Sequence, residues 1–183
     1  NKSHFILMRN IKITLEYDGT DYCGWQRQTN GLSIQELVEK VLKNVLREKI
    51  NLIGAGRTDS GVHAKGQVAN FRTTSKLSLE RIQKALNANL PKDICIKRIK
   101  EAKKTFNARF DTVGKLYRYE IYSGGERMPL SRRYSLQIPY KLDVKAMRKA
   151  ITKLLGKHDF SSFRSSNSNT RTSVRTIKKV SVR

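Results

Sequence analysis

The chain has 183 residues, enough for one sizeable domain or two small ones, and its 38% hydrophobic content allows a globular core. Lysine and arginine number 38 against 15 aspartates and glutamates, so the formal charge is +23. An excess of this size repels itself in a compact chain and is typical of proteins that bind a polyanion. Nucleic acid is the first candidate partner, and an anionic membrane surface is the second.

The few cysteines and histidines argue against a metal site. Cys23 and Cys95 belong to no Cys-x-x-Cys or Cys/His cluster, and the three histidines are scattered singly. We expect two reduced thiols, no metal and a cytoplasmic location. No apolar run approaches the ~20 residues that cross a bilayer, and no secretory h-region is present. Residues 1–8 are left out of the expected fold, with Met8 as a candidate native start.

The first elements along the chain are a strand and a helix. Residues Ile11–Tyr17 alternate apolar and polar with period two, which predicts a half-buried strand that ends at a turn beginning with Asp18. Ser33 and Glu36 form a capping box, and apolar residues follow at helical spacing to Leu46. This pattern predicts a helix with a core face and a solvated polar face.

The sequence also suggests where the polar residues of this helix and a tryptophan that precedes it lie. Glu39, Lys40, Lys43 and Glu48 are assigned to the solvated face of the helix. Trp25, in an aperiodic polar and aromatic stretch, is interpreted as a core anchor in preference to a base-stacking residue.

The next elements complete a six-element unit. Strands are predicted at Leu52–Ile53, Gln67–Arg72 and Ile94–Ile99, and a helix capped by Ser78 is predicted to end at Asn89–Pro91. The order β-α-β-β-α-β is that of ferredoxin-like folds. Two helices then cover one face of an antiparallel sheet and leave the other face free for a ligand or a second domain.

A second unit begins near Lys104. A strand at Tyr117–Tyr122, a helix from Asp143 to a stop at Gly156, and a strand at Ile177–Val182 are predicted, with no closing helix. The fold class is therefore α+β: two ferredoxin-like or RRM-like βαββαβ units, with antiparallel sheets that meet at a central cleft and an incomplete second unit. The domains are expected at residues 9–103 and 104–183.

The stretch from Gly56 to Ala64 places one carboxylate, Asp59, between two glycines and close to Arg57. Its structural interpretation is an Asx-type turn in which Asp59 caps its own backbone. Its functional interpretation is covalent or acid–base chemistry on a nucleotide, because metal-assisted hydrolysis calls for several carboxylates. The segment alone favours the turn. Phosphate-loop, His-Glu-x-x-His and Gly-x-Ser-x-Gly motifs are absent from the sequence.

Seven blocks in order resemble the TruA family of tRNA pseudouridine synthases, and the similarity covers essentially the whole chain after Met8. The blocks are Tyr17–Gly19 with Gly24–Gln28, Gly54–Ala64, Gly66–Val68, Asn87–Pro91, Phe106–Phe110, Tyr117–Tyr119 and Asp159–Arg164.

This resemblance implies isomerisation of uridine to pseudouridine in the tRNA anticodon stem-loop, at positions 38–40. Asp59 matches the catalytic aspartate that attacks the target nucleotide, and a carboxylate with a pKa of ~3.9 is ionised at neutral pH. The uridine has to be flipped out at a cost of a few kcal/mol. Arg57 matches the arginine that fills the vacated space, with a turn-stabilising ion pair as its alternative. Tyr117 matches the tyrosine that stacks on the base, and alone it is equally compatible with a core position.

The resemblance also implies tRNA contacts, a homodimer, and neither metal nor organic cofactor. Two segments align with tRNA-contacting parts of the family, although each alone is typical of a solvated loop. Their residues are Phe106, Asn107, Ala108, Arg109 and Phe110, and then Asn167, Ser168, Asn169, Thr170 and Arg171. Family members continue for dozens of residues past the last strand, and that region supplies a basic partner for the aspartate. We expect this chain to lack that region.

Two other classes are weighed against the enzyme. A non-catalytic tRNA-binding or chaperone protein would bind tRNA with a steep salt dependence and form no pseudouridine. A basic membrane-surface protein is supported by charge alone.

Overall fold

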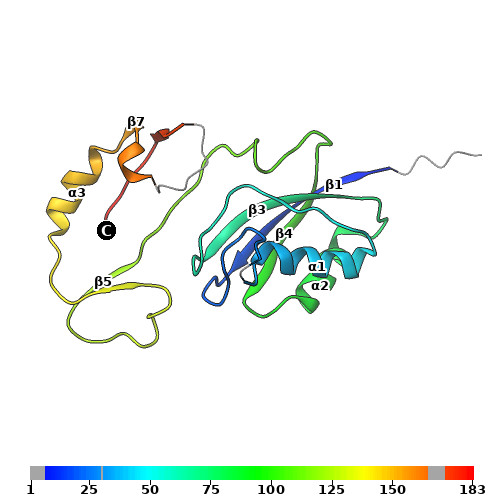
Figure 1. Ribbon diagram of the computed structural model, residues 1–183, viewed down its shortest axis with the longest axis horizontal. Helices are drawn as coiled ribbons and strands as arrows, with labels where there is room; N and C mark the ends of the chain where they lie inside the picture. The colour runs from blue at the N-terminus through cyan, green and yellow to red at the C-terminus, as the bar shows by residue number, and fades with distance from the viewer. Residues whose placement is uncertain (1–6, 30, 165–171) are drawn as a thin grey trace, which may run out of the picture. The chain divides into compact units, whose positions relative to one another are not determined.

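The computed structural model describes residues 7–29, 31–164 and 172–183, and the chain divides into two compact units after Tyr117. The first unit contains β1 (Arg9–Tyr17), α1 (Ile34–Leu46), β2 (Ile53–Gly54), β3 (Ala64–Thr73), α2 (Leu79–Asn89) and β4 (Ile94–Ala102) (Figure 1). The second contains β5 (Ile121–Ser123), β6 (Leu136–Ile138), α3 (Val144–Thr152), β7 (Gly156–Asp159), the 3-10 helix Ser161–Phe163 and β8 (Val174–Ile177). The predicted α+β class is confirmed.

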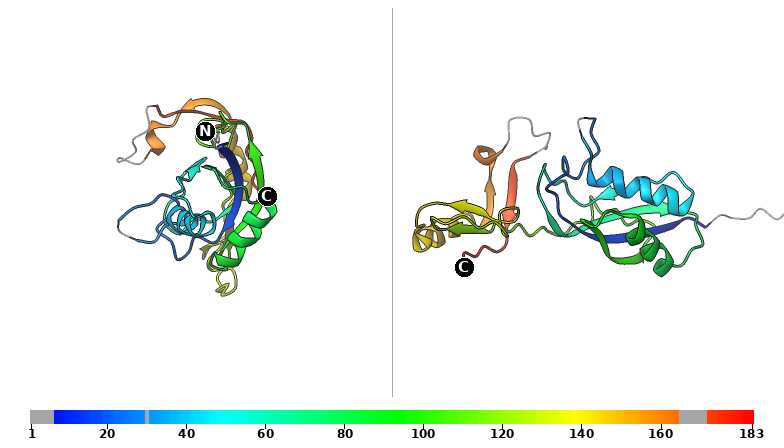
Figure 2. Two further views of the ribbon diagram at one scale, coloured as in Figure 1. Left: turned by 90° about the vertical axis from the view of Figure 1, so that its right-hand side faces the viewer. Right: turned by 90° about the horizontal axis from the view of Figure 1, so that it is seen from below.

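The first unit is an antiparallel sheet in the order β2-β3-β1-β4, which is the strand order of a ferredoxin-like fold. The central strand β1 alternates as its sequence predicts, with Ile11, Ile13 and Leu15 fully buried. These side chains share one hydrophobic core with apolar residues of both helices. Figure 2 shows α1 and α2 lying along the sheet. The opposite face of β1 presents Lys12, Thr14 and Glu16, which are only half-buried.

Helix α1 begins and packs as predicted, with one exception on its polar face. The Ser33 hydroxyl accepts a hydrogen bond from the Glu36 N–H at 3.3 Å and so caps the first turn. Val38 and Leu42 are fully buried against the sheet. Glu39, however, is only 7% exposed, so its assignment to the solvated face was wrong. The cause is a set of polar partners outside the helix, which periodicity does not record.

The second unit differs in detail from its predicted elements. The strand expected at Tyr117–Tyr122 begins only at Ile121, and the strand expected at Ile177–Val182 is β8, which ends at Ile177. Strands β6 and β7 were not predicted. β5 and β6 pair in parallel, against the antiparallel expectation, whereas β7 and β8 pair antiparallel. The connection 124–135 between β5 and β6 has the dozen residues that a parallel crossover needs.

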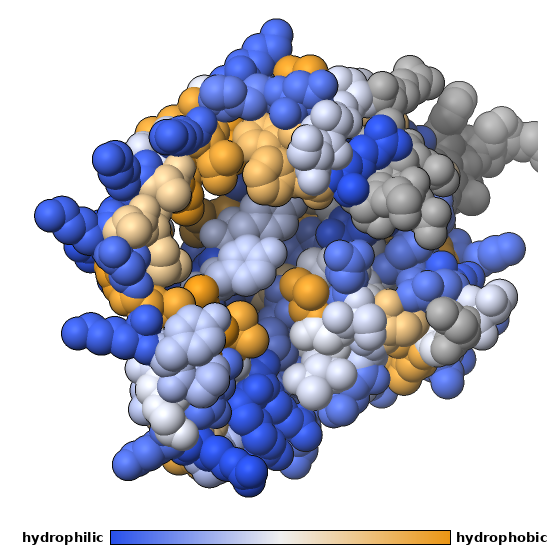
Figure 3. Space-filling view, turned by 60° about the vertical axis from the view of Figure 1, so that its left-hand side comes forward, coloured by the Kyte–Doolittle hydropathy of each residue, from blue (hydrophilic) through white to orange (hydrophobic). Residues whose placement is uncertain are grey.

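No described residue from Arg118 onward is buried. Large apolar side chains such as Leu130 and Phe163 are exposed there, and the face in Figure 3 shows apolar residues among hydrophilic ones. Isolated two-stranded sheets are marginally stable in water. Local caps such as Asp143, whose carboxylate accepts from the Ala146 N–H at 2.8 Å, therefore carry more of this unit's order than a core does.

Glu48, just after α1, holds the far end of β3 and ties the stability of the first unit to pH. Its carboxylate accepts from the Thr74 hydroxyl at 2.6 Å and the Thr73 hydroxyl at 2.9 Å. Burial alone raises the pKa of Glu48, but these hydrogen bonds outweigh it and hold the pKa below its ordinary value of 4.5. The stabilisation is therefore present above about pH 4.5 and is lost as the pH falls through the lowered pKa.

Glu48→Gln is expected to lower the melting temperature at pH 7, because the amide is a weaker acceptor than the carboxylate. The difference from wild type should shrink between pH 5 and pH 3, since the wild-type carboxyl then becomes neutral as well. Thermal unfolding followed by circular dichroism at both pH values measures this. Glu80→Gln on the exposed face of α2 is the control. A difference between wild type and Glu48→Gln that does not change with pH would contradict the assignment.

Candidate active site

The stretch from Gly56 to Ala64 forms the connection between β2 and β3. The backbone ladder extends one residue past β2, where the Ala55 N–H donates to the Val68 carbonyl at 2.8 Å. The Gln67 side-chain amide then donates to the Gly56 carbonyl at 2.6 Å. Lys115 packs across Gly56, so close that a Cβ built there would lie 2.8 Å from its Nζ. The base of the loop is therefore fixed on both sides before the chain reaches Asp59.

A second segment, residues 18–25 after β1, binds the loop through its backbone. The Trp25 N–H donates to the Thr58 carbonyl at 3.0 Å, and the Gly61 N–H donates to the Tyr22 carbonyl at 3.2 Å. The Ser60 hydroxyl also donates to the Tyr22 carbonyl, at 3.2 Å. These bonds lie on both sides of Asp59 in sequence, so they fix the backbone that carries its carboxylate.

Glycines allow these two backbones to approach so closely. Gly24 has φ +102°, and a Cβ there would lie 2.4 Å from the Thr58 carbonyl oxygen. At Gly19 a Cβ would lie 2.1 Å from the Val62 carbonyl oxygen. Real Cβ contacts are never this short, so any other residue would separate the segments. Gly61 has φ +77° but open space around its Cβ position, so there only the turn itself favours glycine.

Two aromatic side chains support the loop from beneath. The Tyr17 hydroxyl hydrogen-bonds the Thr58 hydroxyl at 2.8 Å, and burial raises the pKa of Tyr17 although this hydrogen bond lowers it in part. Trp25 is 2% exposed, stacks on Tyr17 with 6.1 Å between ring centroids, and covers Gly54. The interpretation of Trp25 as a core anchor is confirmed, because a ring so buried has no free face for a base.

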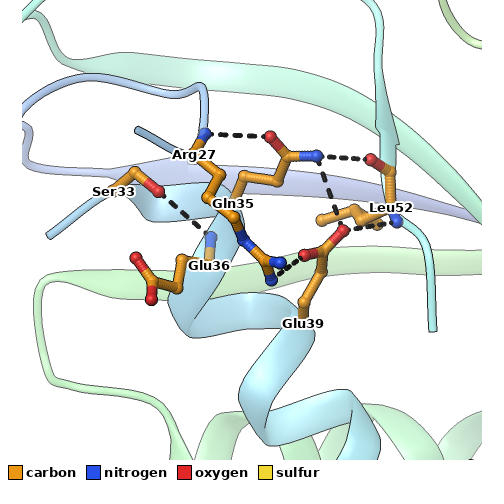
Figure 4. A network of polar contacts seen from close by, with 6 residues as sticks. All are labelled: Arg27, Ser33, Gln35, Glu36, Glu39 and Leu52. Atoms are coloured by element: carbon orange, nitrogen blue, oxygen red, sulfur yellow. Dashed lines mark hydrogen bonds and ion pairs between the residues drawn. The ribbon is translucent and has the colours of Figure 1, made fainter. Parts of the chain in front are cut away.

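A buried carboxylate of α1, that of Glu39, binds Arg27, which follows Trp25 by two residues, and Leu52, which precedes β2 (Figure 4). Glu39 accepts from the Leu52 N–H at 2.9 Å and from the Arg27 guanidinium at 2.5 Å. Gln35 bridges the same elements, because its amide donates to the Leu52 carbonyl at 2.9 Å and accepts from the Arg27 N–H at 3.1 Å. The segment that holds the loop is thus itself held by α1.

Asp59 and Arg57 both extend into solvent from this loop. Within the described ranges, neither side chain has a hydrogen bond or an ion pair. The Asx-type turn is therefore wrong for the Asp59 side chain: its backbone carbonyl accepts from the Val62 N–H at 3.2 Å, and the carboxylate stays free. The alternative of a turn-stabilising ion pair for Arg57 likewise finds no partner in this part of the chain. A rigid loop presents an unengaged carboxylate and a guanidinium two residues apart.

Sequence reasoning named Tyr17, Gly19, Gly24 and His63 only within the blocks that carry the family resemblance, and it assigned them no role in positioning this loop. His63 accepts from the Gly19 N–H through Nδ1 at 3.1 Å, and the same nitrogen lies 3.0 Å from a carboxylate oxygen of Asp18. The glycines in both stretches were the available signal, but a sequence does not state which backbone each glycine admits.

The segment Phe106–Phe110, predicted as a solvated loop if taken alone, is partly buried and partly exposed. The buried side chains of Asn10 and Asn70 bind its backbone, and Ala108 is 2% exposed. Arg109 and Phe110 are exposed, with the guanidinium 5.7 Å from the ring centroid.

The other predicted RNA contacts are not placed together with Asp59. Tyr117 is 74% exposed, and the structure gives it no contact with Asp59. Asn167, Ser168, Asn169, Thr170 and Arg171 lie outside the described residues.

The described residues contain neither a cluster of metal ligands nor a membrane-spanning helix. No group of three or more His, Cys, Asp or Glu side chains in them is arranged to hold a metal ion. Among the helices of this same part of the chain, none has the length and apolar character to cross a membrane.

Known proteins resemble this chain over most of its length. The family model of tRNA pseudouridine synthase matches residues 13–111 and 150–183, which include β1 from Ile13 onward, both helices of the first unit and the Asp59 loop. tRNA pseudouridine synthase A of Acetivibrio thermocellus is 49% identical over 175 residues, which are 96% of this chain and 72% of that protein. The enzyme of the same name from Geobacter sulfurreducens is 47% identical with the same coverage. That of Thermoanaerobacter pseudethanolicus is 45% identical over 93% of this chain and 70% of its own length.

The chain therefore belongs to the tRNA pseudouridine synthase family, and its predicted membership of the TruA family is confirmed.

Gly24→Ala is expected to destabilise the first unit more than Gly61→Ala. Both substitutions strain a backbone with positive φ, at roughly 1–2 kcal/mol, but only the first also drives a Cβ into the Thr58 carbonyl. Urea unfolding of both variants and wild type measures the difference. Equal losses would show that the close approach of the two segments contributes nothing to stability.

Proposed function

We propose that this protein converts uridine to pseudouridine in tRNA, at positions 38–40 of the anticodon stem-loop. The coarser part of this statement, an isomerase of the pseudouridine synthase family, follows from family membership. The positions in the anticodon stem-loop are proposed from the resemblance to the TruA family alone. The observation that supports catalysis by Asp59 is its free carboxylate on a loop held by backbone hydrogen bonds on both sides. A nucleophile that makes no other interaction and needs no activating base is suited to attack a nucleotide.

Asp59 is assigned the role of nucleophile toward the target nucleotide. Its attack forms a bond to the nucleotide and allows the bond between uracil N1 and ribose C1′ to break. The detached uracil rotates and forms a new bond from C5 to C1′, and the bond to Asp59 breaks, which restores the free carboxylate. The hydrogen on C5 leaves as a proton, and N1 ends with a proton, so atoms balance without an oxidant or reductant. Arg57 is assigned to the space vacated by the flipped base, and Tyr117 to stacking on uracil.

Charge and exposure support tRNA as the partner. The formal charge of +23 steers the protein toward RNA, and Arg109 and Phe110 offer an exposed guanidinium and ring for phosphate and base contacts. Cofactor-free catalysis and a homodimer complete the proposal and are based on the resemblance to the TruA family. A cytoplasmic location is proposed from the two isolated cysteines, which are typical of reduced thiols.

Asp59→Asn is expected to abolish tritium release from tRNA labelled at uridine C5, by at least about 10³-fold, because an amide cannot replace an attacking carboxylate. Binding of tRNA should persist. Asp143→Asn is the matched control, since asparagine preserves the cap of α3. Substantial release by Asp59→Asn would reject the assigned role. Tight tRNA binding by wild type without any release would favour a non-catalytic tRNA-binding protein.

Tyr17→Phe tests whether the hydroxyl contact positions the loop. The ring still packs on Trp25, while the bond to Thr58, worth about 1 kcal/mol net, is removed. We expect kcat to fall roughly tenfold, equivalent to about 1.4 kcal/mol in the barrier, with KM unchanged.

Thr58→Val provides the control for this effect. Combined with Tyr17→Phe, it should reduce kcat no further, because both substitutions remove one interaction. Fully additive losses would contradict a shared positioning contact.

A further inference from the structure

We propose that the open face of the first-unit sheet carries a phosphate-binding site, built from Lys12, Lys100 and Lys103, for a phosphodiester of the RNA substrate away from the target uridine. The proposal goes further than the proposed function and rests on RNA being the substrate. It begins from the strand register. Lys12 on β1 lies directly opposite Lys100 on β4.

Two like charges at directly opposed positions of an antiparallel pair are destabilising, because their Cβ atoms are about 4.5–5.5 Å apart. The neighbouring positions do not relieve this pair: Thr14 lies opposite Arg98, the next cation on the same face. The nearby carboxylate of Glu16 is engaged by Lys97 at 3.2 Å. Lys12 makes no ion pair within the described ranges, nor does Lys100. The sheet thus holds an unneutralised pair of cations that a bound anion would compensate.

The wall beside these lysines is a rigid part of the chain. Asn10 donates to the carbonyls of Lys103 and Phe106 at 2.8 and 2.9 Å. Asn70 donates to Asn10 at 2.9 Å and accepts from the Ala108 N–H at 2.8 Å. Both asparagines are at most 4% exposed, so these bonds are shielded from water. The chain from Lys103 to Ala108 is therefore fixed across the open face before any ligand binds.

Between the strands and this wall lies an open cavity of about 500 Å³, lined by Lys12, Lys100, Lys103 and Phe106 among others. The ammonium of Lys12 lies 4.9 Å from the Phe106 ring centroid. Two carboxylates also line the cavity, but both are engaged. Glu101 accepts from Arg9 at 2.6 Å, and Asp111 accepts from the Asn107 N–H at 2.8 Å. Arg9 neutralises Glu101, whereas Asp111 keeps its negative charge, so the three lysines that line the cavity exceed this carboxylate by two positive charges.

The position of the cavity distinguishes it from the Asp59 loop. Lys12 precedes Tyr17, which supports that loop, by five strand residues, or about 17 Å at ~3.4 Å per residue. A phosphate held there belongs to the RNA chain at a distance from the reacting uridine. Its contribution is to affinity and orientation rather than to the chemical step.

The experiment compares a pocket variant, Lys12→Gln with Lys100→Gln, against a control of equal charge change, Lys40→Gln with Lys43→Gln on the exposed face of α1. The affinity for tRNA is measured from 50 to 300 mM salt. We expect the pocket variant to bind roughly tenfold more weakly at low salt. Its log–log salt slope should be smaller by about 0.7–0.9 for each phosphate that the variant no longer neutralises, and the control should stay close to wild type.

Folding and the anion itself are measured on the same proteins. The melting temperature of the pocket variant should equal or exceed that of wild type, because opposed charges are removed. Inorganic phosphate at 10 mM should raise the melting temperature of wild type and control more than that of the pocket variant.

Three outcomes would overturn the proposal. One is equal tRNA affinity and slope for the pocket variant and the control. Another is a phosphate-dependent shift with an unchanged tRNA slope, which would mean a site for small anions only. The third is a phosphate-dependent rise in melting temperature that is as large in the pocket variant as in wild type. These readouts are independent of pseudouridine formation, so failure of the catalytic assignment would be recognised separately by tritium release.

Discussion

The contact between two glycine-bearing backbones is the constraint on which the rest of the first unit depends. The segment after β1 reaches the Asp59 loop through the Trp25 N–H and the Tyr22 carbonyl, both within 3.2 Å of their partners. Only glycine at positions 19 and 24 permits the approach. These contacts confine a loop that would otherwise sample many conformations. The conformational entropy of the backbone at Asp59 is therefore lost when the protein folds and not when the substrate reacts.

That contact is anchored in the hydrophobic core. Tyr17 is the last residue of β1, and the alternation that buries Ile13 and Leu15 also turns the Tyr17 ring inward beneath the loop. Trp25 fills the space between this ring and β2. The buried Glu39 then joins the same segment to α1. The hydrophobic core, α1 and the Asp59 loop are therefore coupled, so a change in the core or in α1 is expected to alter the position of Asp59.

Local patterns predicted the elements of the first unit because period-two alternation and capping residues act over a few positions. The strand Ile11–Tyr17 and the caps Ser33 and Ser78 are found where they were expected. Long-range polar partners left no such pattern. Glu39 was placed on the wrong face because its acceptor role depends on Leu52 and Arg27, which are distant in sequence.

The sequence predicted the functional residues of the candidate site but not the contacts that hold them in place. Asp59 and Arg57 were singled out from their motif, whereas the bond from Tyr17 to Thr58 spans 41 positions. In the second unit the prediction was weaker for a physical reason. β6 has three residues and β7 has four, and none of them is buried. Neither strand therefore shows the alternation of apolar and polar residues that predicts a strand.

The pair of buried asparagines on the open face has one more consequence, for strand register. Asn10 on β1 and Asn70 on β3 are satisfied only by each other and by the chain that crosses above them. A slip of β1 by one residue would turn Asn10 toward the helices and bury its amide among aliphatic side chains without partners. The amide pair thus excludes the misaligned sheet, and the alignment that it selects is the one that brings the end of β1 beneath Thr58. Asn10 and Asn70, on the open face of the sheet, thus help to fix the strand register on which the position of the Asp59 loop depends.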